Sequence, residues 1–163
     1  MAAALSAHEG EPPLPFDVDP FRRYGFGEER RFDLILVEDK GPVIGYALFC
    51  HSFHVGVGTP GLHMFDLVVE PSHRRSGAER RLAGALSRVC LERGGTWIIW
   101  QCQPRNVEAL EFYDRINGRR FAAANCRHGS GDRLTFNPAL TGLRPCCRPR
   151  RHWPPGGSVV VEH

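Results

Sequence analysis

Two segments of the chain combine residue types and spacings that could do chemistry. In the first, an apolar run ending at Val69 leads through a turn containing Arg and Gly into a segment with helical periodicity. Such a turn offers backbone N–H groups at the positive end of a helix dipole, which suits a phosphate group. The guanidinium groups of Arg74, Arg75, Arg80 and Arg81 match phosphate oxygens. The segment therefore predicts a phosphate site, and the alternative is a solvated, basic helix start.

The second segment has the pattern Asn106-x-x-Ala109-x-x-Phe112-Tyr113. Ala109 and Tyr113 are four residues apart, so they share one face of a helix. A phenol with a reference pKa of about 10 stays protonated at neutral pH, so near a thiolate leaving group it could act as a general acid. The alternative is a tyrosine packed in the core with its hydroxyl satisfied.

The sequence indicates neither a metal site nor a reactive thiol. The six cysteines show no C-x-x-C spacing and no Cys/His pair at zinc-finger distance, and only His152 lies close to the vicinal pair Cys146–Cys147. Residues 1–5 lack the basic region of a signal peptide, so we expect reduced thiols and a cytoplasmic protein. No apolar run approaches the roughly 20 residues of a membrane helix, so we expect no membrane partner.

Composition and charge fit one globular domain. The chain has 163 residues, of which 42% are hydrophobic, and this is enough to form a core. The net charge is only +3, because 18 acidic residues nearly balance 21 basic ones. Without an aromatic-plus-basic motif, this balance gives no reason to expect a nucleic-acid partner.

Hydrophobic patterning predicts the elements that position the two segments. Strands are expected at 32–38, 43–50 and 62–69, with a turn at 39–42 and a loop at 55–61. A helix over 78–93, a buried strand over 96–102 and a second helix over 107–116 follow, and weaker strands near 121–126 and 132–136 close the sheet. The strand–helix–strand units require parallel pairing, so the fold class is mixed α/β with an antiparallel start.

The predicted domain organisation has three parts. Residues 1–20 carry four prolines and are read as a flexible arm. Residues 21–137 form the domain. Residues 138–163 are rich in Arg and Pro, and we expect them not to pack as part of the domain.

Taken together, these segments resemble the GNAT superfamily of acetyl-CoA-dependent N-acetyltransferases. Its diamine (spermidine/spermine) and thialysine acetyltransferases are the most similar subfamily. The similarity begins at Tyr24-Gly25-Phe26-Gly27-Glu28, includes the strands at 43–49 and 60–69, and reaches about Phe136, or roughly two thirds of the chain. The resemblance implies a single GNAT-like domain in which the family's first strand and most of its first helices have no counterpart before Tyr24.

The resemblance implies a role for each matching residue. Acetyl-CoA would be bound by the pyrophosphate motif Arg-x-x-Gly-x-Gly/Ala and its surroundings, through Leu67, Val69, Arg74, Arg75, Gly77, Ala78, Arg80, Asn106 and Phe112. Tyr113 would give a proton to the CoA thiolate. Asp66 and His63 would hold the amine, and the base would be Asp66, His63 or a water, of which a water held by Asp66 is favoured.

Several positions depart from the family pattern, and three of them lie at the expected donor and acceptor sites. Glu79 stands where the motif has Gly or Ala, which places a carboxylate close to a pyrophosphate. Arg75 replaces the glycine that usually follows the motif's arginine. Phe65 replaces the glutamate that usually precedes Asp66 and helps to deprotonate the amine.

Two hypotheses of function follow. In the first, the protein is an enzyme that transfers an acetyl group from acetyl-CoA to a primary amine of a small polyamine-like or amino-acid-like substrate by direct attack. In the second, it is a catalytically weak or inactive GNAT-like module for binding or dimerisation, which Glu79, Phe65 and the short region before Tyr24 favour. The sequence does not fix the oligomeric state, so a homodimer stays open.

Overall fold

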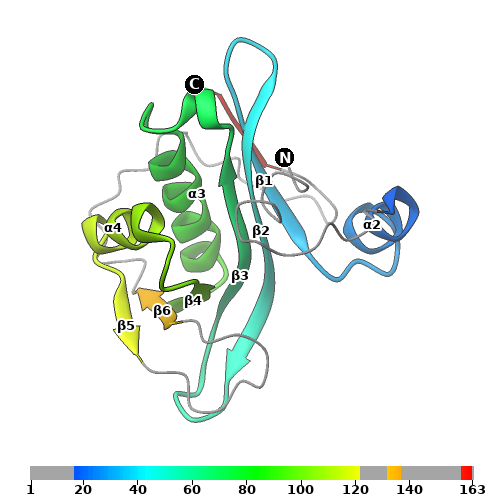
Figure 1. Ribbon diagram of the computed structural model, residues 1–163. Coiled ribbons are helices and arrows are strands. Elements are labelled where there is room, and N and C mark those ends of the chain that lie inside the picture. The colour runs from blue at the N-terminus through cyan, green and yellow to red at the C-terminus, as the bar shows by residue number, and fades with distance from the viewer. Residues whose placement is uncertain (1–16, 122–131, 137–158, 163) are drawn as a thin grey trace.

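The computed structural model describes residues 17–121, 132–136 and 159–162. In chain order the elements are α2 (Val18–Phe26), β1 (Asp33–Glu38), β2 (Val43–His54), β3 (Thr59–Val69), the 3-10 helix η1 (Pro71–His73), α3 (Ala78–Glu92), β4 (Trp97–Cys102), α4 (Val107–Arg115), β5 (Arg119–Phe121), β6 (Asp132–Phe136) and β7 (Val159–Glu162) (Figure 1).

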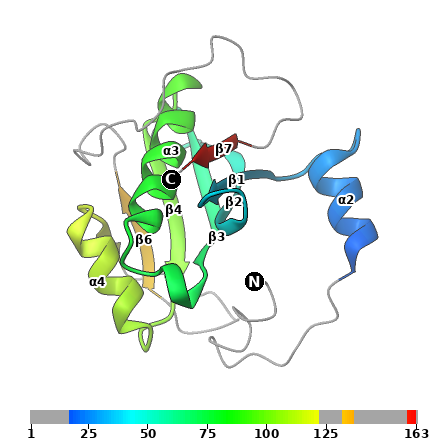
Figure 2. The ribbon, with the colours of Figure 1, turned by 90° about the horizontal axis from the view of Figure 1, so that it is seen from above.

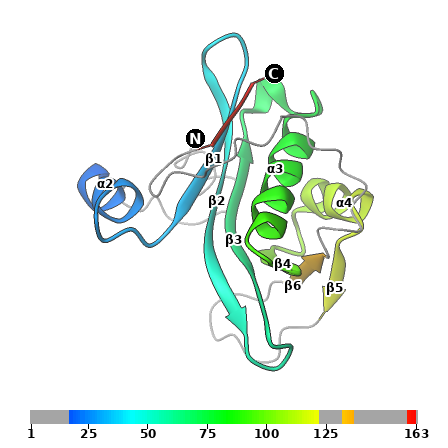
Figure 3. The same ribbon diagram turned by 180° about the vertical axis from the view of Figure 1, so that it is seen from behind.

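The strands form one mixed sheet in the order β5-β6-β4-β3-β2-β1-β7. Strands β1, β2 and β3 are antiparallel neighbours, and β2 and β3 form the long hairpin that dominates Figure 3. The crossover through α3 makes β4 parallel to β3, whereas β6 runs antiparallel to both β4 and β5. The predicted fold class, a mixed α/β domain with an antiparallel start, is confirmed.

Helix α3 packs on one face of the sheet and forms the core. Its predicted apolar face is at most 6% exposed at every position, namely Ala78, Leu82, Ala85, Leu86, Val89 and Cys90. The helix lies against β1, β2, β3 and β4. Alternate sheet residues such as Ala47, Phe49 and Ile98 meet it, as the pleat of a strand requires. Each large aliphatic side chain buried there contributes roughly 1.5–3 kcal/mol, so this contact fixes α3 and the turn that leads into it.

Strands β3 and β4 are paired over a short length only. Their register joins Gly61 to Trp97, Leu62 to Ile98 and His63 to Ile99. The indole of Trp97 lies against Gly61, where a Cβ would overlap the ring, and its Nε1 donates to the carbonyl of Thr59 (3.2 Å). Beyond His63 and Ile99 the sheet pairing between these two strands ends. Parallel strands that part in this way leave room for a ligand at their carboxyl ends.

The N-terminal helix differs from the sequence prediction. The sequence predicts a flexible arm over residues 1–20, whereas α2 begins at Val18, where the carboxylate of Asp17 accepts a hydrogen bond from the N–H of Asp19 (3.0 Å). The helix contains Pro20 and buries only Gly25, so it lacks the apolar face by which a helix stands out in a sequence. It lies beyond β1, with the sheet between it and the helices α3 and α4 (Figure 2).

The C-terminal strand is a second difference. The sequence predicts that residues 138–163 do not pack with the domain, whereas β7 pairs with β1 in parallel, from Ile35–Val159 to Glu38–Glu162. This pairing uses the free backbone groups of an edge strand, so it needs no alternating apolar pattern. The other residues of the predicted arm and tail, and residues 122–126 of a predicted strand, lie outside the described residues.

Candidate active site

The two segments that the sequence marked out meet at one cavity. The cavity has a volume of about 530 Å³ and lies between the end of β3, the turn before α3 and one side of α4. It is lined by Leu67, Val68, Val69, Arg74, Arg75, Gly77, Glu79, Arg80, Asn106, Glu108, Ala109, Glu111, Phe112, Tyr113, Arg115 and Ile116. Its volume is typical of a pocket for a small molecule or cofactor.

The backbone of β3 directs hydrogen-bond donors towards this cavity. The N–H of Glu70 donates to the carbonyl of Ile44 on β2 (2.8 Å). In an antiparallel pair every second residue bonds to the neighbouring strand, so Leu67 and Val69 direct their N–H groups away from β2. Both residues line the cavity and lie beyond the paired part of β4. Two backbone donors therefore face the side on which β4 has parted from β3.

The turn before α3 is held in a conformation that few residues adopt. Arg75 has φ +61° and Gly77 has φ +93°. A Cβ at Gly77 would meet nothing within 4 Å, so its backbone conformation, and not lack of space, calls for glycine here. The first helical bond runs from the N–H of Arg81 to the carbonyl of Gly77 (3.1 Å). The N–H groups of residues 78–80 thus have no acceptor within the helix, as a phosphate site requires.

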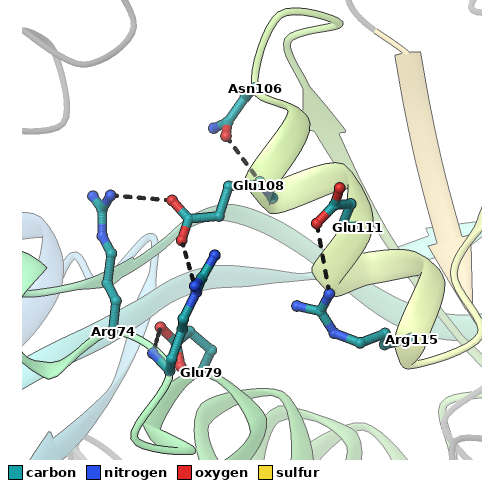
Figure 4. Close-up of polar contacts among 8 residues, drawn as sticks. Arg74, Glu79, Asn106, Glu108, Glu111 and Arg115 are labelled. Atoms are coloured by element: carbon teal, nitrogen blue, oxygen red, sulfur yellow. Dashed lines mark hydrogen bonds and ion pairs between the residues drawn. The ribbon is translucent and has the colours of Figure 1, made fainter.

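The side chain of Glu79 folds back onto the turn before α3. Its Oε1 accepts a hydrogen bond from the N–H of Arg75 (3.3 Å), and the side chain lines the cavity (Figure 4). The carboxylate also lies in the first turn of α3, where the helix dipole favours a negative charge. Glu79 therefore occupies part of the region in which the resemblance places a pyrophosphate.

A second carboxylate reaches the same arginines from α4. Glu108 lies between Arg74 and Arg75, with Oε2 at 3.5 Å from Nη1 of Arg74 and Oε1 at 3.8 Å from Nε of Arg75 (Figure 4). The Glu108 side chain is 50% exposed, so solvent screens both ion pairs. These contacts join the turn before α3 to the start of α4 across the cavity, and a stronger anion could displace them.

Helix α4 and its N-cap contribute one polar and two aromatic residues to the cavity lining, namely Asn106, Phe112 and Tyr113. The Oδ1 of Asn106 accepts a hydrogen bond from the N–H of Ala109 (3.2 Å) and caps the helix. Tyr113 is 7% exposed, and its ring centroid lies 4.7 Å from that of Trp100 and 5.4 Å from that of Phe112. Tyr113 is thus packed in the core and also lines the cavity.

The residues predicted to hold the amine lie on the other side of β3. His63 is opposite Cys50 on β2, and Asp66 is opposite Leu48. Cys50 and Leu48 alternate with core residues such as Phe49, so all four side chains belong to the sheet face that is turned away from α3. Neither His63 nor Asp66 lines the cavity.

The cavity collects most, but not all, of the candidate residues. It brings together Leu67, Val69, Arg74, Arg75, Gly77, Arg80, Asn106, Phe112 and Tyr113. Ala78 is fully buried beneath the turn, so only its backbone can face a ligand. Sequence reasoning missed Glu108, Glu111 and Arg115. The three residues follow one another at spacings of three and four, which places them along one edge of α4 and could have revealed them.

Two searches of the described residues found nothing. No group of three or more His, Cys, Asp or Glu side chains in this part of the chain is arranged to hold a metal ion. None of the described helices combines the length and the apolar character needed to span a membrane.

Comparison with known proteins identifies the family. The chain belongs to the acetyltransferase (GNAT) family, whose sequence model matches residues 2–118. Members of this family transfer an acetyl group from acetyl-CoA to an amine.

Solved structures share the fold. An integron cassette protein from the mobile metagenome of Vibrio cholerae is 22% identical with a TM-score of 0.57, and the match covers 77% of this chain and 76% of that one. A transcriptional regulator from Bacillus halodurans is 16% identical with a TM-score of 0.62, over 74% of this chain and 83% of the other. At these identities the likeness establishes a common fold.

Proposed function

We propose that this protein is an acetyl-CoA-dependent N-acetyltransferase that acts on a primary amine of a small molecule. The observation that carries the proposal is the cavity itself. It joins the unpaired edge of β3, the positive turn before α3 and the buried Tyr113 in one space of about 530 Å³. Family membership supplies the reaction class, and the cavity supplies a place for each part of the donor.

The residues present fit acetyl-CoA. The N–H groups at the start of α3 and the guanidinium groups of Arg74, Arg75 and Arg80 would hold the pyrophosphate. The N–H groups of Leu67 and Val69 would bind the acetyl-pantetheine arm along the edge of β3. Acetyl-CoA supplies the activated acetyl group as a thioester.

The chemistry of transfer needs one base and one acid. The neutral amine attacks the thioester carbonyl, a C–N bond forms, and the C–S bond breaks. A backbone N–H on β3 stabilises the negative charge on the carbonyl oxygen. Tyr113 donates its hydroxyl proton to the departing sulfur, and a water held by Asp66 takes the proton from nitrogen.

A thiol-release assay with acetyl-CoA and a panel of diamines, polyamines, thialysine, lysine and simple monoamines tests the activity. Calorimetric titration with acetyl-CoA tests donor binding separately. The proposal expects micromolar binding and amine-dependent release of CoA. Binding without release for any amine would contradict the enzyme.

A non-catalytic binding module is the second candidate, because Glu79 already occupies an N–H group of the anion-binding turn. A module that has lost its donor site would show no binding at millimolar acetyl-CoA. Binding in the micromolar range would reject this candidate.

A further inference from the structure

We propose that the acceptor is a monoamine with an aromatic or apolar body, bound on the sheet face turned away from α3, against the stacked rings of His63 and Phe65. This inference rests on the proposed function and names its substrate class. It differs from the polyamine class that the sequence resemblance suggested.

The cavity runs along the edge of β3, beyond the point where its pairing with β4 ends. Leu67 and Val69 face the side of α3, whereas Val68, opposite Tyr46, faces away from it. All three β3 residues line the cavity. Because β4 does not pair with β3 beyond His63, a donor held along this edge can be approached from the face that carries His63 and Asp66.

An irregularity in β3 gathers three side chains at this place. Phe49 pairs with Met64, but its neighbour Leu48 pairs with Asp66, so Phe65 is an extra residue that bulges from the strand. The bulge interrupts the alternation of β3. It places Asp66 on the same face as His63, although three positions separate them in the sequence.

The rings of Phe65 and His63 form an open aromatic surface. Their centroids are 4.7 Å apart and the ring planes are inclined by 32°. Phe65 is 51% exposed. Among the described residues, the half-buried Leu48, Cys50 and Ile99 lie on this face of the sheet and add apolar surface beside the rings. An exposed aromatic pair is suited to stack on a ring or to hold an ammonium group over its face.

The charge of the three strands that carry this surface argues against a polyamine. Asp66 is the one acidic residue of the strands β2, β3 and β4. A polyamine carries several ammonium groups along one chain, and each of them needs a carboxylate or water when it binds. One carboxylate matches one ammonium, and the aromatic surface matches an apolar body. Phe65 therefore provides a hydrophobic contact where the resembling enzymes have a second acid.

The experiment compares the full-length protein and two variants. Thiol release is measured at saturating acetyl-CoA with 2-phenylethylamine and with spermidine. Phe65→Ala removes the aromatic surface, and Phe53→Ala, at a position on β2 that is 59% exposed, is the matched control. We expect kcat/KM for 2-phenylethylamine to exceed that for spermidine by about ten-fold or more. Phe65→Ala should raise the KM for 2-phenylethylamine about five-fold or more without changing the KM for acetyl-CoA, and Phe53→Ala should change neither.

The results that would overturn this inference are different from those that would overturn the proposed function. Equal or better turnover of spermidine, or identical behaviour of the two alanine variants, would overturn the inference while the enzyme stands. If neither amine is acetylated, saturation-transfer NMR with 2-phenylethylamine decides the binding surface. A signal that Phe65→Ala abolishes and Phe53→Ala keeps would support it, and no signal in the unaltered protein would reject it.

Discussion

Nη1 of Arg74 lies 3.5 Å from Oε2 of Glu108, so an acidic side chain of α4 pairs with the arginine that begins the family's pyrophosphate motif. The two residues are 34 positions apart in the sequence and come from opposite walls of the cavity. In the proposed donor site the phosphates of acetyl-CoA would compete with this carboxylate. The proposal therefore expects the affinity for acetyl-CoA to depend on the acids of the cavity as well as on its arginines.

Replacing Glu108 tests this competition. Glu108→Gln removes the charge that faces Arg74 and Arg75 and keeps the side-chain size. Because the ion pairs are exposed, we expect acetyl-CoA to bind only about two- to five-fold more tightly, measured by calorimetry at low salt. The gain should shrink as ionic strength rises. Glu92→Gln, which breaks a comparable pair with Arg88 at the far end of α3, is the control and should leave Kd unchanged.

Glu79 makes a second test of donor binding. Glu79→Ala restores the small residue of the family motif and frees the N–H of Arg75. We expect acetyl-CoA to bind about five-fold more tightly or better, because a like charge near a pyrophosphate costs on the order of 1 kcal/mol. The same variant should unfold at a slightly lower temperature, since α3 loses a favourable charge in its first turn. Weaker binding of acetyl-CoA by the variant would contradict this prediction. It would show that the hydrogen bond from Arg75 to Glu79 stabilises the turn by more than the Glu79 charge repels the phosphates.

The proposed general-acid role of Tyr113 can be tested separately from its packing. Tyr113→Phe keeps the ring against Trp100 and removes only the hydroxyl. We expect kcat to fall by roughly 10²–10⁴-fold while the Kd for acetyl-CoA stays nearly constant. Tyr24→Phe, on the distant helix α2, should leave both unchanged. If Tyr113→Phe keeps the kcat of the unaltered protein, Tyr113 has a packing role only and is not the general acid.

The buried carboxylate of Asp33 makes stability depend on pH. Burial alone would raise its pKa, but the hydrogen bond from His51 and the charges of Arg30 and Arg93 outweigh burial, so the pKa of Asp33 is lowered. A lowered carboxyl pKa contributes stability above the unfolded value of about 3.9, and this contribution is lost as pH falls through the folded value.

We therefore expect Asp33→Asn to lower the free energy of unfolding at pH 7 by about 1–3 kcal/mol. The difference from the unaltered protein should narrow as pH falls below 4. Urea unfolding at several pH values measures it. Asp114→Asn, which breaks the exposed pair with Arg120, is the control and should cost little at any pH. If the difference in free energy of unfolding is the same at every pH, Asp33 stabilises the protein through packing and not through its charge.

The sequence predicted those parts of the molecule that depend on local periodicity. The apolar face of α3 and the cap at Asn106 follow from spacing along a few turns of helix, and both are present. The turn at Arg74–Gly77 was predictable because Arg and Gly residues between a strand and a helix are typical of a phosphate-binding turn. These features need no knowledge of distant contacts.

Features that depend on the register between strands were not predictable in the same way. The bulge at Phe65 depends on how β3 pairs with β2, and a single strand read alone shows no shift. The contact of Glu108 with Arg74 requires the whole crossover through α3 and β4 to be in place. Helix α2 was missed because it buries only Gly25 and contains Pro20, so its sequence shows no apolar face.

The contact of Trp97 with Gly61 places a fluorescent side chain at the point where β3 and β4 separate. The indole sits at the closed end of the two parting strands, with its Nε1 bound to the carbonyl of Thr59. When the donor enters along β3, any widening between the strands changes the environment of this ring. The emission of Trp97 would then report occupancy in real time without a label, and a Trp97→Phe variant would identify its share of the signal.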